Sequence, residues 1–158
     1  DALGDQFLLF GKGFEPIADK AEAIDGYRYH LAIENCAVAD CLTEKLFDPL
    51  LGWSLPIYAG CPNAQDYLPA AAFRRIDIGD PQAAIATIRD VLERDPWEAH
   101  LPAIADAREK ILGELTVFGL LRRHVGPVST PSLVRPEPLL RNKHFKGLRS
   151  LLHGRGTV

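Results

Sequence analysis

The sequence predicts an α/β domain in which helices cover a parallel sheet. Short apolar segments alternate with segments of helical periodicity through the first two thirds of the chain, which is typical of that class. The 158 residues, of which 47% are hydrophobic and 25% charged, suit one soluble folded core. No apolar run approaches the roughly 20 residues that a membrane span needs. We therefore expect a soluble α/β domain with a single core.

Four short apolar segments are the predicted strands. Each has the length of a strand and is followed by turn residues or charged residues. They are residues 7–10, 29–33, 55–59 and 73–78. Gly11 and Gly13 end the first segment, and Gly60 ends the third.

Two helices are predicted after the last of these strands. Asp80 can cap a helix that has Pro81 at its first position, and Asp95 and Pro96 repeat that start signal. Apolar residues then recur at helical spacing: Ala84, Ile85, Ile88, Val91 and Leu92 in the first segment, and Leu101, Ile104, Ile111, Leu112 and Leu115 in the second. The second stripe runs on toward Arg122.

The distribution of charge divides the chain into two parts. Residues 1–126 carry 12 Lys and Arg against 20 Asp and Glu, a net charge of −8, whereas residues 127–158 carry 6 against 1, a net charge of +5. Several prolines follow residue 126 and indicate an irregular connection. We expect a folded domain over residues 1–126, then a proline-containing connection and a basic amphipathic tail over residues 127–158.

The tail interleaves apolar and basic side chains. These are Leu140, Phe145, Leu148, Leu151 and Leu152 among Arg141, Lys143, Lys146 and Arg149. One interpretation is a basic amphipathic helix on an anionic membrane surface or against a partner. The other is a terminal helix that packs on its own domain while its basic residues are solvated. The sequence leaves both open.

The ends of the chain and its cysteines bear on its origin and location. The chain has no methionine and begins at Asp1, so we interpret it as a processed chain or a piece of a longer one. Cys36, Cys41 and Cys61 form an odd set without C-x-x-C spacing, which favours neither a disulfide framework nor a zinc site. A reducing cytoplasm fits best, with peripheral contact at the inner face of the membrane if the tail binds lipid.

Several common catalytic motifs do not occur in the sequence. There is no G-x-x-x-x-G-K-[ST] loop, no H-E-x-x-H, no G-x-S-x-G and no D-x-D pair. The glycines at positions 11 and 13 lack a third glycine at dinucleotide spacing, and the five histidines are scattered. We therefore expect neither a metal ion nor a cofactor.

A polar cluster lies between the second and third predicted strands. Glu34 and Asn35 directly follow an apolar strand, and Thr43, Glu44 and Lys45 directly precede an apolar segment. Ligands of open α/β sheets bind beyond the carboxyl ends of the strands, where helices begin. A helix N-terminus with Lys45 suits a phosphate, and Glu44 can accept two hydrogen bonds from a ribose diol. The alternative is a simple cap, with Thr43 as N-cap and Glu44 complementing the helix dipole.

Three motifs in order resemble a known family. Residues 27–35 (YRYHLAIEN), 42–48 (LTEKLFD) and 56–63 (PIYAGCPN) are similar to the donor-binding half of the family 10 glycosyltransferases, the α-1,3/1,4-fucosyltransferases. Residues 10–16 (FGKGFEP) also resemble bacterial members. The similarity covers roughly residues 7–121. It implies a two-domain glycosyltransferase B-type fold, in which this chain is the Rossmann-like C-terminal half that holds GDP-fucose.

The resemblance also implies roles for the five polar residues. Glu44 matches the residue that binds the ribose hydroxyls, and Lys45 the one that neutralises the diphosphate. Glu34 and Asn35 match an F-E-N donor motif, and Thr43 begins the T-E-K motif, which completes the predicted donor-binding set.

The reaction that the family implies is metal-independent and inverting. The protein supplies the cation that stabilises the leaving GDP. A glycan hydroxyl, such as one of a bacterial surface polysaccharide, accepts the fucose and loses its proton to a carboxylate expected in an N-terminal half. The catalytic residues therefore stay unknown from this chain, and no nucleic acid partner is expected.

Two departures from the family pattern put details in doubt. Cys41 stands where the family commonly has tyrosine, and Pro49 lies inside the expected helix, unless Asp48 and Pro49 restart it. The acceptor half, the base and an upstream phosphate-binding arginine are also absent. Two alternatives therefore stay open: a non-catalytic nucleotide-sugar-binding module, and a glycosyltransferase with another donor such as GDP-mannose.

Overall fold

A three-stranded parallel sheet forms the centre of the protein. The computed structural model describes residues 7–125, so the predicted tail over residues 127–158 lies outside the described residues. The strands are β1 (Tyr29–Ile33), β2 (Leu55–Ala59) and β3 (Arg74–Arg75), in the order β1-β2-β3. The helices are α1 (Glu44–Leu51), α2 (Pro81–Arg94), α3 (Trp97–Lys110) and α4 (Val117–Val125). Short helical turns lie at Lys20–Ala23, Ala64–Asp66, Ala70–Ala72 and Ile111–Leu115.

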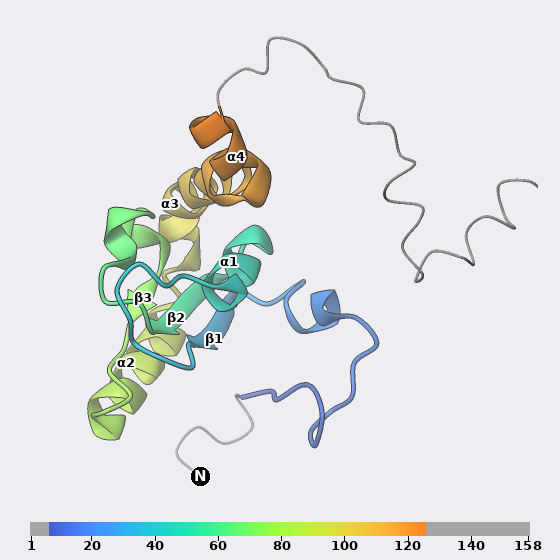
Figure 1. Cartoon of the computed structure of the whole chain (residues 1–158). Helices are drawn as coiled ribbons and strands as arrows, with labels where there is room; N and C mark the ends of the chain where they lie inside the picture. The colour runs from blue at the N-terminus through green and yellow to red at the C-terminus, as the bar shows by residue number, and fades with distance from the viewer. Residues whose placement is uncertain (1–6, 126–158) are drawn as a thin grey trace, which may run out of the picture. The chain divides into compact units, whose positions relative to one another are not determined.

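Helices cover both faces of the sheet, which confirms the predicted Rossmann-like α/β class (Figure 1). Strands β1 and β2 pair Leu31 with Ile57 and Ala32 with Tyr58. Ala32 and Tyr58 pack against α1 and α3, whereas Leu31 and Ile57 pack against α2. All five residues of β2 are buried, as expected for a parallel strand covered on both faces.

Helix α1 connects β1 to β2 and provides much of the core. Leu46 and Leu50 of this helix are completely buried, and each such side chain contributes about 1.5–3 kcal/mol by leaving water. The helix continues through Pro49, which is also buried. The alternative in which Asp48 and Pro49 restart the helix is therefore wrong.

The first predicted strand, residues 7–10, is not a strand. Phe10 makes an isolated bridge with Glu15, because Gly11 and Gly13 adopt positive φ angles of 109° and 93° and turn the chain back at once. Backbone groups of this segment bond one another within the turn. Gly11 N–H donates to Glu15 O at 2.8 Å, and Glu15 N–H donates to Leu9 O at 3.3 Å. The fourth predicted strand shortens to β3, because a turn over residues 77–79 follows it.

The helix start signals give one confirmed cap and one correction. Asp80 accepts a hydrogen bond from Ala83 N–H at 3.0 Å, and Pro81 begins α2 as predicted. Asp95 does not cap α3. It ends α2 in a left-handed conformation, and its carboxylate accepts from the Tyr29 hydroxyl at 2.5 Å and pairs with Arg28.

The predicted second helix is interrupted. α3 ends at Lys110, a π-helical turn follows, and extended Thr116 precedes α4. Within residues 7–125, no helix is long and apolar enough to cross a membrane.

Candidate functional site

The predicted polar residues gather at the carboxyl edge of the sheet. Glu34 and Asn35 follow β1, and Gly60 follows β2. Glu44 and Lys45 begin α1 at the same edge. Parallel strands that end together, next to a helix N-terminus, form the usual ligand-binding edge of an open α/β sheet. The structure therefore brings the predicted set to one edge.

Glu34 joins the end of β1 to the start of α1. Its side chain is 3% exposed, and its two oxygens accept from Thr43 N–H at 3.2 Å and from the Thr43 hydroxyl at 2.7 Å. Gly60 leaves the space for it, since a Cβ at that position would lie 2.3 Å from Glu34 Cγ. A buried carboxylate with hydrogen-bond partners is stable in this place, and here it holds Thr43.

Thr43 caps α1, as the capping interpretation expected. Its backbone is extended, and its hydroxyl accepts a hydrogen bond from Lys45 N–H at 3.2 Å. A cap of this kind stabilises a helix by about 0.5–2 kcal/mol. The Lys45 ammonium takes no part in this cap and lies instead beside the Glu44 carboxylate at the helix N-terminus.

Glu44 and Lys45 form a pair of opposite charges at the surface. Lys45 Nζ lies 3.2 Å from Glu44 Oε1 and 4.0 Å from Glu34 Oε2. The hydrogen bond from Lys45 holds the pKa of Glu44 below its usual value, so Glu44 stays an ionised acceptor. Two carboxylates share one ammonium, so a diphosphate would need further positive charge beside it.

Asn35 and Cys41 lie on the loop between β1 and α1. Asn35 is exposed at the carboxyl edge. Cys41 is half-buried, and burial is the main cause of the raised pKa of its thiol, with nearby Cys36 adding to it. The residue that replaces the family tyrosine is therefore a neutral thiol at pH 7. All three cysteines are free thiols.

A hydrogen-bond network that the sequence reasoning missed holds this loop from the side. Asp40 and Asn63 bond each other twice, and Tyr67 donates to Asp40. Asn63 lies within the motif of residues 56–63 that resembles the family, but its partner Asp40 is 23 residues away in the sequence. The spacing of the sequence carries no signal for that pair.

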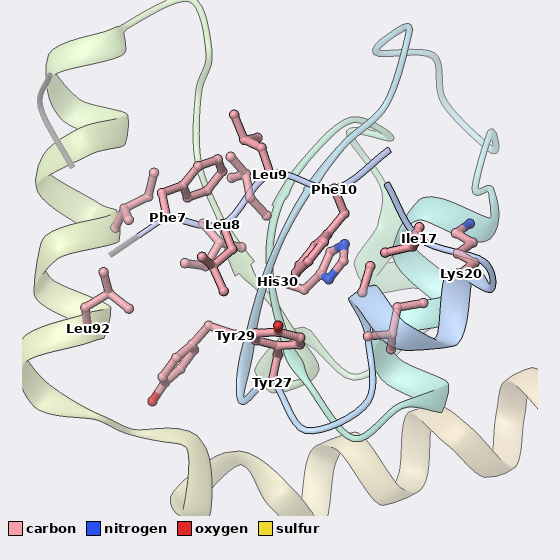
Figure 2. A pocket seen from close by; sticks show the side chains of 15 residues that line it. Phe7, Leu8, Leu9, Phe10, Ile17, Lys20, Tyr27, Tyr29, His30 and Leu92 are labelled. Carbon is pink, nitrogen blue, oxygen red and sulfur yellow. The ribbon is translucent and has the colours of Figure 1, made fainter. Parts of the chain in front are cut away.

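A pocket lies elsewhere, beside the outer edge of β1. It has a volume of about 430 Å³ and is lined mostly by apolar side chains of residues 7–10, β1 and α2. Figure 2 shows Phe7, Leu8 and Leu92 on one side and His30, Ile17 and Lys20 on the other. Lys20 pairs with Asp48 at 2.6 Å. None of the predicted donor residues lines this pocket, and an anion needs the charged edge rather than an apolar hollow.

No cluster of three or more His, Cys, Asp or Glu side chains in the described range is arranged to hold a metal ion. The fold and its charged carboxyl edge define an open α/β domain of the class that binds ligands at the ends of its parallel strands. The family described as "Glycosyltransferase family 10 (fucosyltransferase) C-term" matches residues 9–96. The chain belongs to this family, as the three motifs predicted.

Curated relatives agree with this assignment. The chain is 39% identical over 108 residues to an α-(1,3)-fucosyltransferase B of Drosophila melanogaster, which covers 65% of this chain and 24% of the relative. It is 51% identical over 47 residues to an α-(1,4)-fucosyltransferase of Arabidopsis thaliana, 30% of this chain and 12% of the relative. It is 46% identical over 44 residues to a GDP-fucose protein O-fucosyltransferase 3 of Xenopus laevis, 28% of this chain and 9% of the relative.

The chain therefore spans a quarter or less of the length of these three relatives. No solved structure matches it. The three relatives come from a plant, an insect and an amphibian, so the expected bacterial origin stays a prediction.

Proposed function

We propose that this chain is the donor-binding half of an enzyme that transfers fucose from GDP-fucose to a glycan hydroxyl. Membership of a fucosyltransferase family supports the class of reaction. The observation that carries the assignment of the site is the Glu44 and Lys45 pair at the N-terminus of α1. Glutamate and lysine side by side match the two parts of a nucleoside diphosphate, the ribose hydroxyls and the phosphates.

Each residue has a defined part in the proposed mechanism. The ionised Glu44 accepts hydrogen bonds from the ribose, and Lys45 stabilises the negative charge that builds on GDP as the bond between fucose and phosphate breaks. Inversion requires the acceptor hydroxyl to attack from the opposite face. Its proton goes to a base that we place outside this chain, together with a second cation for the diphosphate.

The metal-free character of the transfer is part of this proposal. The positive charge that would otherwise come from a metal ion comes from Lys45 and from the partial positive charge of the α1 N-terminus. Addition of a chelator should therefore leave the dissociation constant of GDP unchanged. A clear loss of GDP binding on chelation would contradict metal independence but not the location of the site.

A GDP titration of the chain tests the site. Calorimetry should detect GDP binding by the wild-type chain, and Lys45→Ala should weaken it by about tenfold or more, since hydrogen bonds to charged groups contribute about 1.5–3 kcal/mol. Lys12→Ala is the matched control, because Lys12 is an exposed lysine on the turn before Phe14. Equal GDP affinity of Lys45→Ala and the wild type would overturn the assignment.

The donor sugar and the cellular setting are further parts of the proposal. Titration with GDP-mannose beside GDP-fucose decides between the two donors.

Catalysis needs the base that we place outside this chain, so activity should require the acceptor half. GDP binding without activity in the full-length protein would favour the non-catalytic module. The cytoplasmic location stays a prediction. So does the lipid contact of residues 127–158, which vesicle sedimentation of the chain can test.

A further inference from the structure

The loop that carries the donor site is irregular and exposed. The donor loop, residues 35–42, runs from the end of β1 to the cap of α1 without regular secondary structure. Its residues from Asn35 to Asp40 are all exposed to solvent. Apolar burial therefore contributes little to its order, and specific hydrogen bonds must hold it in one conformation.

Asp40 and Asn63 form a reciprocal pair at the middle of this loop. Asp40 N–H donates to Asn63 Oδ1 at 2.9 Å, and Asn63 Nδ2 donates to Asp40 Oδ1 at 2.7 Å. The Tyr67 hydroxyl donates to the same Asp40 oxygen at 2.7 Å. These bonds hold the pKa of the Asp40 carboxyl below its usual value. The loop is thereby fastened to the segment that follows β2.

The backbone of Asp40 depends on this pair. Asp40 has φ 63°, a left-handed conformation that residues other than glycine adopt infrequently, although aspartate and asparagine tolerate it best. Such a conformation persists where the surrounding contacts determine it. The two bonds with Asn63 are contacts of this kind.

The partner segment is itself rigidly held. Arg75 Nη2, on β3, donates to Cys61 O at 2.9 Å, to Pro62 O at 3.0 Å and to Gln65 Oε1 at 2.8 Å. The Cys61 thiol and the Asp66 carboxylate also bond the Asn63 amide. Asn63 is therefore a fixed point, and the donor loop is attached to it rather than the reverse.

We propose that Asp40 and Asn63 are positioning residues that hold the donor loop in the conformation that binds the nucleotide. The inference rests on the proposed function of the Glu44 and Lys45 edge. Glu34 and Thr43 anchor the loop at its base, and Asp40 and Asn63 anchor it at its middle. Two anchors leave Asn35 and the start of α1 preorganised, so that nucleotide binding does not have to order them.

Substitutions at Asp40 separate positioning from general stability. Asp40→Ala removes the acceptor for Asn63 and Tyr67. Asp40→Asn keeps an oxygen acceptor and tolerates the left-handed backbone, so it should rescue the loop. Asp40→Gly relieves the backbone conformation while removing the side chain, and it serves if Asp40→Ala fails to fold. Asp106→Ala removes an exposed carboxylate on α3 as the matched control.

Two measurements on the chain give the answer. Amide hydrogen exchange of residues 35–42 without ligand should rise in Asp40→Ala, while exchange in β1 and β2 stays at the wild-type rate. Calorimetric titration with GDP should show affinity about tenfold weaker in Asp40→Ala and restored in Asp40→Asn, the size expected when a binding loop must be ordered on association.

The contradicting outcomes are distinct for the two proposals. Absence of GDP binding by the wild-type chain would overturn the proposed function, while the exchange experiment would still test whether Asp40 orders the loop. Wild-type exchange in Asp40→Ala would overturn the ordering role. Increased exchange with unchanged GDP affinity would overturn positioning for binding, and so would failure of Asp40→Asn to restore the GDP affinity.

Discussion

Two regions of this domain, the carboxyl edge of the sheet and the pocket beside the outer edge of β1, differ in almost every respect. The pocket has a volume of about 430 Å³, and aromatic and aliphatic side chains line most of it. The carboxyl edge is charged and is held by hydrogen bonds of Glu34 and Asp40. A charged nucleotide is recognised by fixed polar groups, so the carboxyl edge is the better candidate.

Of the changes that would disrupt the carboxyl edge, Gly60→Ala should have the largest effect on stability and on GDP binding. The new methyl group would lie 2.3 Å from Glu34 Cγ and 2.6 Å from the Tyr58 hydroxyl. We expect about 3 kcal/mol of lost unfolding free energy, as for an overpacked core, together with loss of GDP binding. Urea unfolding and a GDP titration measure both. Gly113→Ala is the control, since nothing lies within 4 Å of a Cβ there. Equal stability of the two variants would show that Glu34 moves aside freely.

Glu34→Gln should have the next largest effect. The amide can accept from only one of the two Thr43 donors, and its own N–H groups would face the other donor. We expect a loss of about 1–2 kcal/mol in unfolding free energy, since one buried group loses its partner. Thermal unfolding with and without GDP measures it. Full stability together with full GDP affinity would contradict the anchoring role.

His30, which lines the pocket, should make the unfolding free energy of the protein depend on pH between 7.5 and 5. Burial, and to a lesser extent Lys20, lower the pKa of His30 below 6.5. As pH falls, the unfolded chain therefore binds the proton before the folded chain does. The contribution of neutral His30 to the unfolding free energy is complete above pH 6.5 and is lost as pH falls through the folded pKa. Unfolding free energies measured from pH 7.5 to 5 should decrease, and less so in His30→Phe. The same slope in both proteins would remove His30 as the cause.

The smallest expected effect is the titration of Glu44. Its folded pKa lies below 4.5 because of the hydrogen bond from Lys45. The contribution of the ionised form is therefore present above pH 4.5 and lost as pH falls through the lower folded pKa. The affinity for GDP-fucose, whose esterified phosphates do not titrate between pH 7 and 5, should be constant over that range and fall only below pH 4.5, and Glu44→Gln should remove that fall. A midpoint near pH 6 would assign the change to another group.

The contrast between the two regions also explains which features the sequence could predict. Local patterns identified β1, β2, α2 and the start of α1, because Thr43 and Asp80 bond to residues two or three positions away. The patterns failed where tertiary contacts decided the outcome. Asp95 is a residue type that commonly caps helices, but its carboxylate accepts hydrogen bonds from Arg28 and Tyr29 instead.

The sequence predicted the residues of the candidate site but not the hydrogen bonds that hold them in place. Glu34, Glu44 and Lys45 follow from their position after a strand and before a helix. That Glu34 holds Thr43, and that Asn63 holds Asp40, follows only from the folded arrangement, because the two pairs are 9 and 23 residues apart. Residues 7–10 have the composition of a strand, but the turn at Gly11 and Gly13 satisfies their backbone locally.

Both anchors of the donor loop join residues within one β1-α1-β2 unit and the turns directly after it. Contacts of such short sequence separation close quickly during folding, since little loop entropy is lost. We therefore expect the nucleotide edge to form early, before α3 completes the core. Pulse-labelling hydrogen exchange can measure this order, and protection of α3 before β1 would contradict it. A site built in this way is a local unit of assembly, whose anchoring hydrogen bonds join residues no more than 23 positions apart.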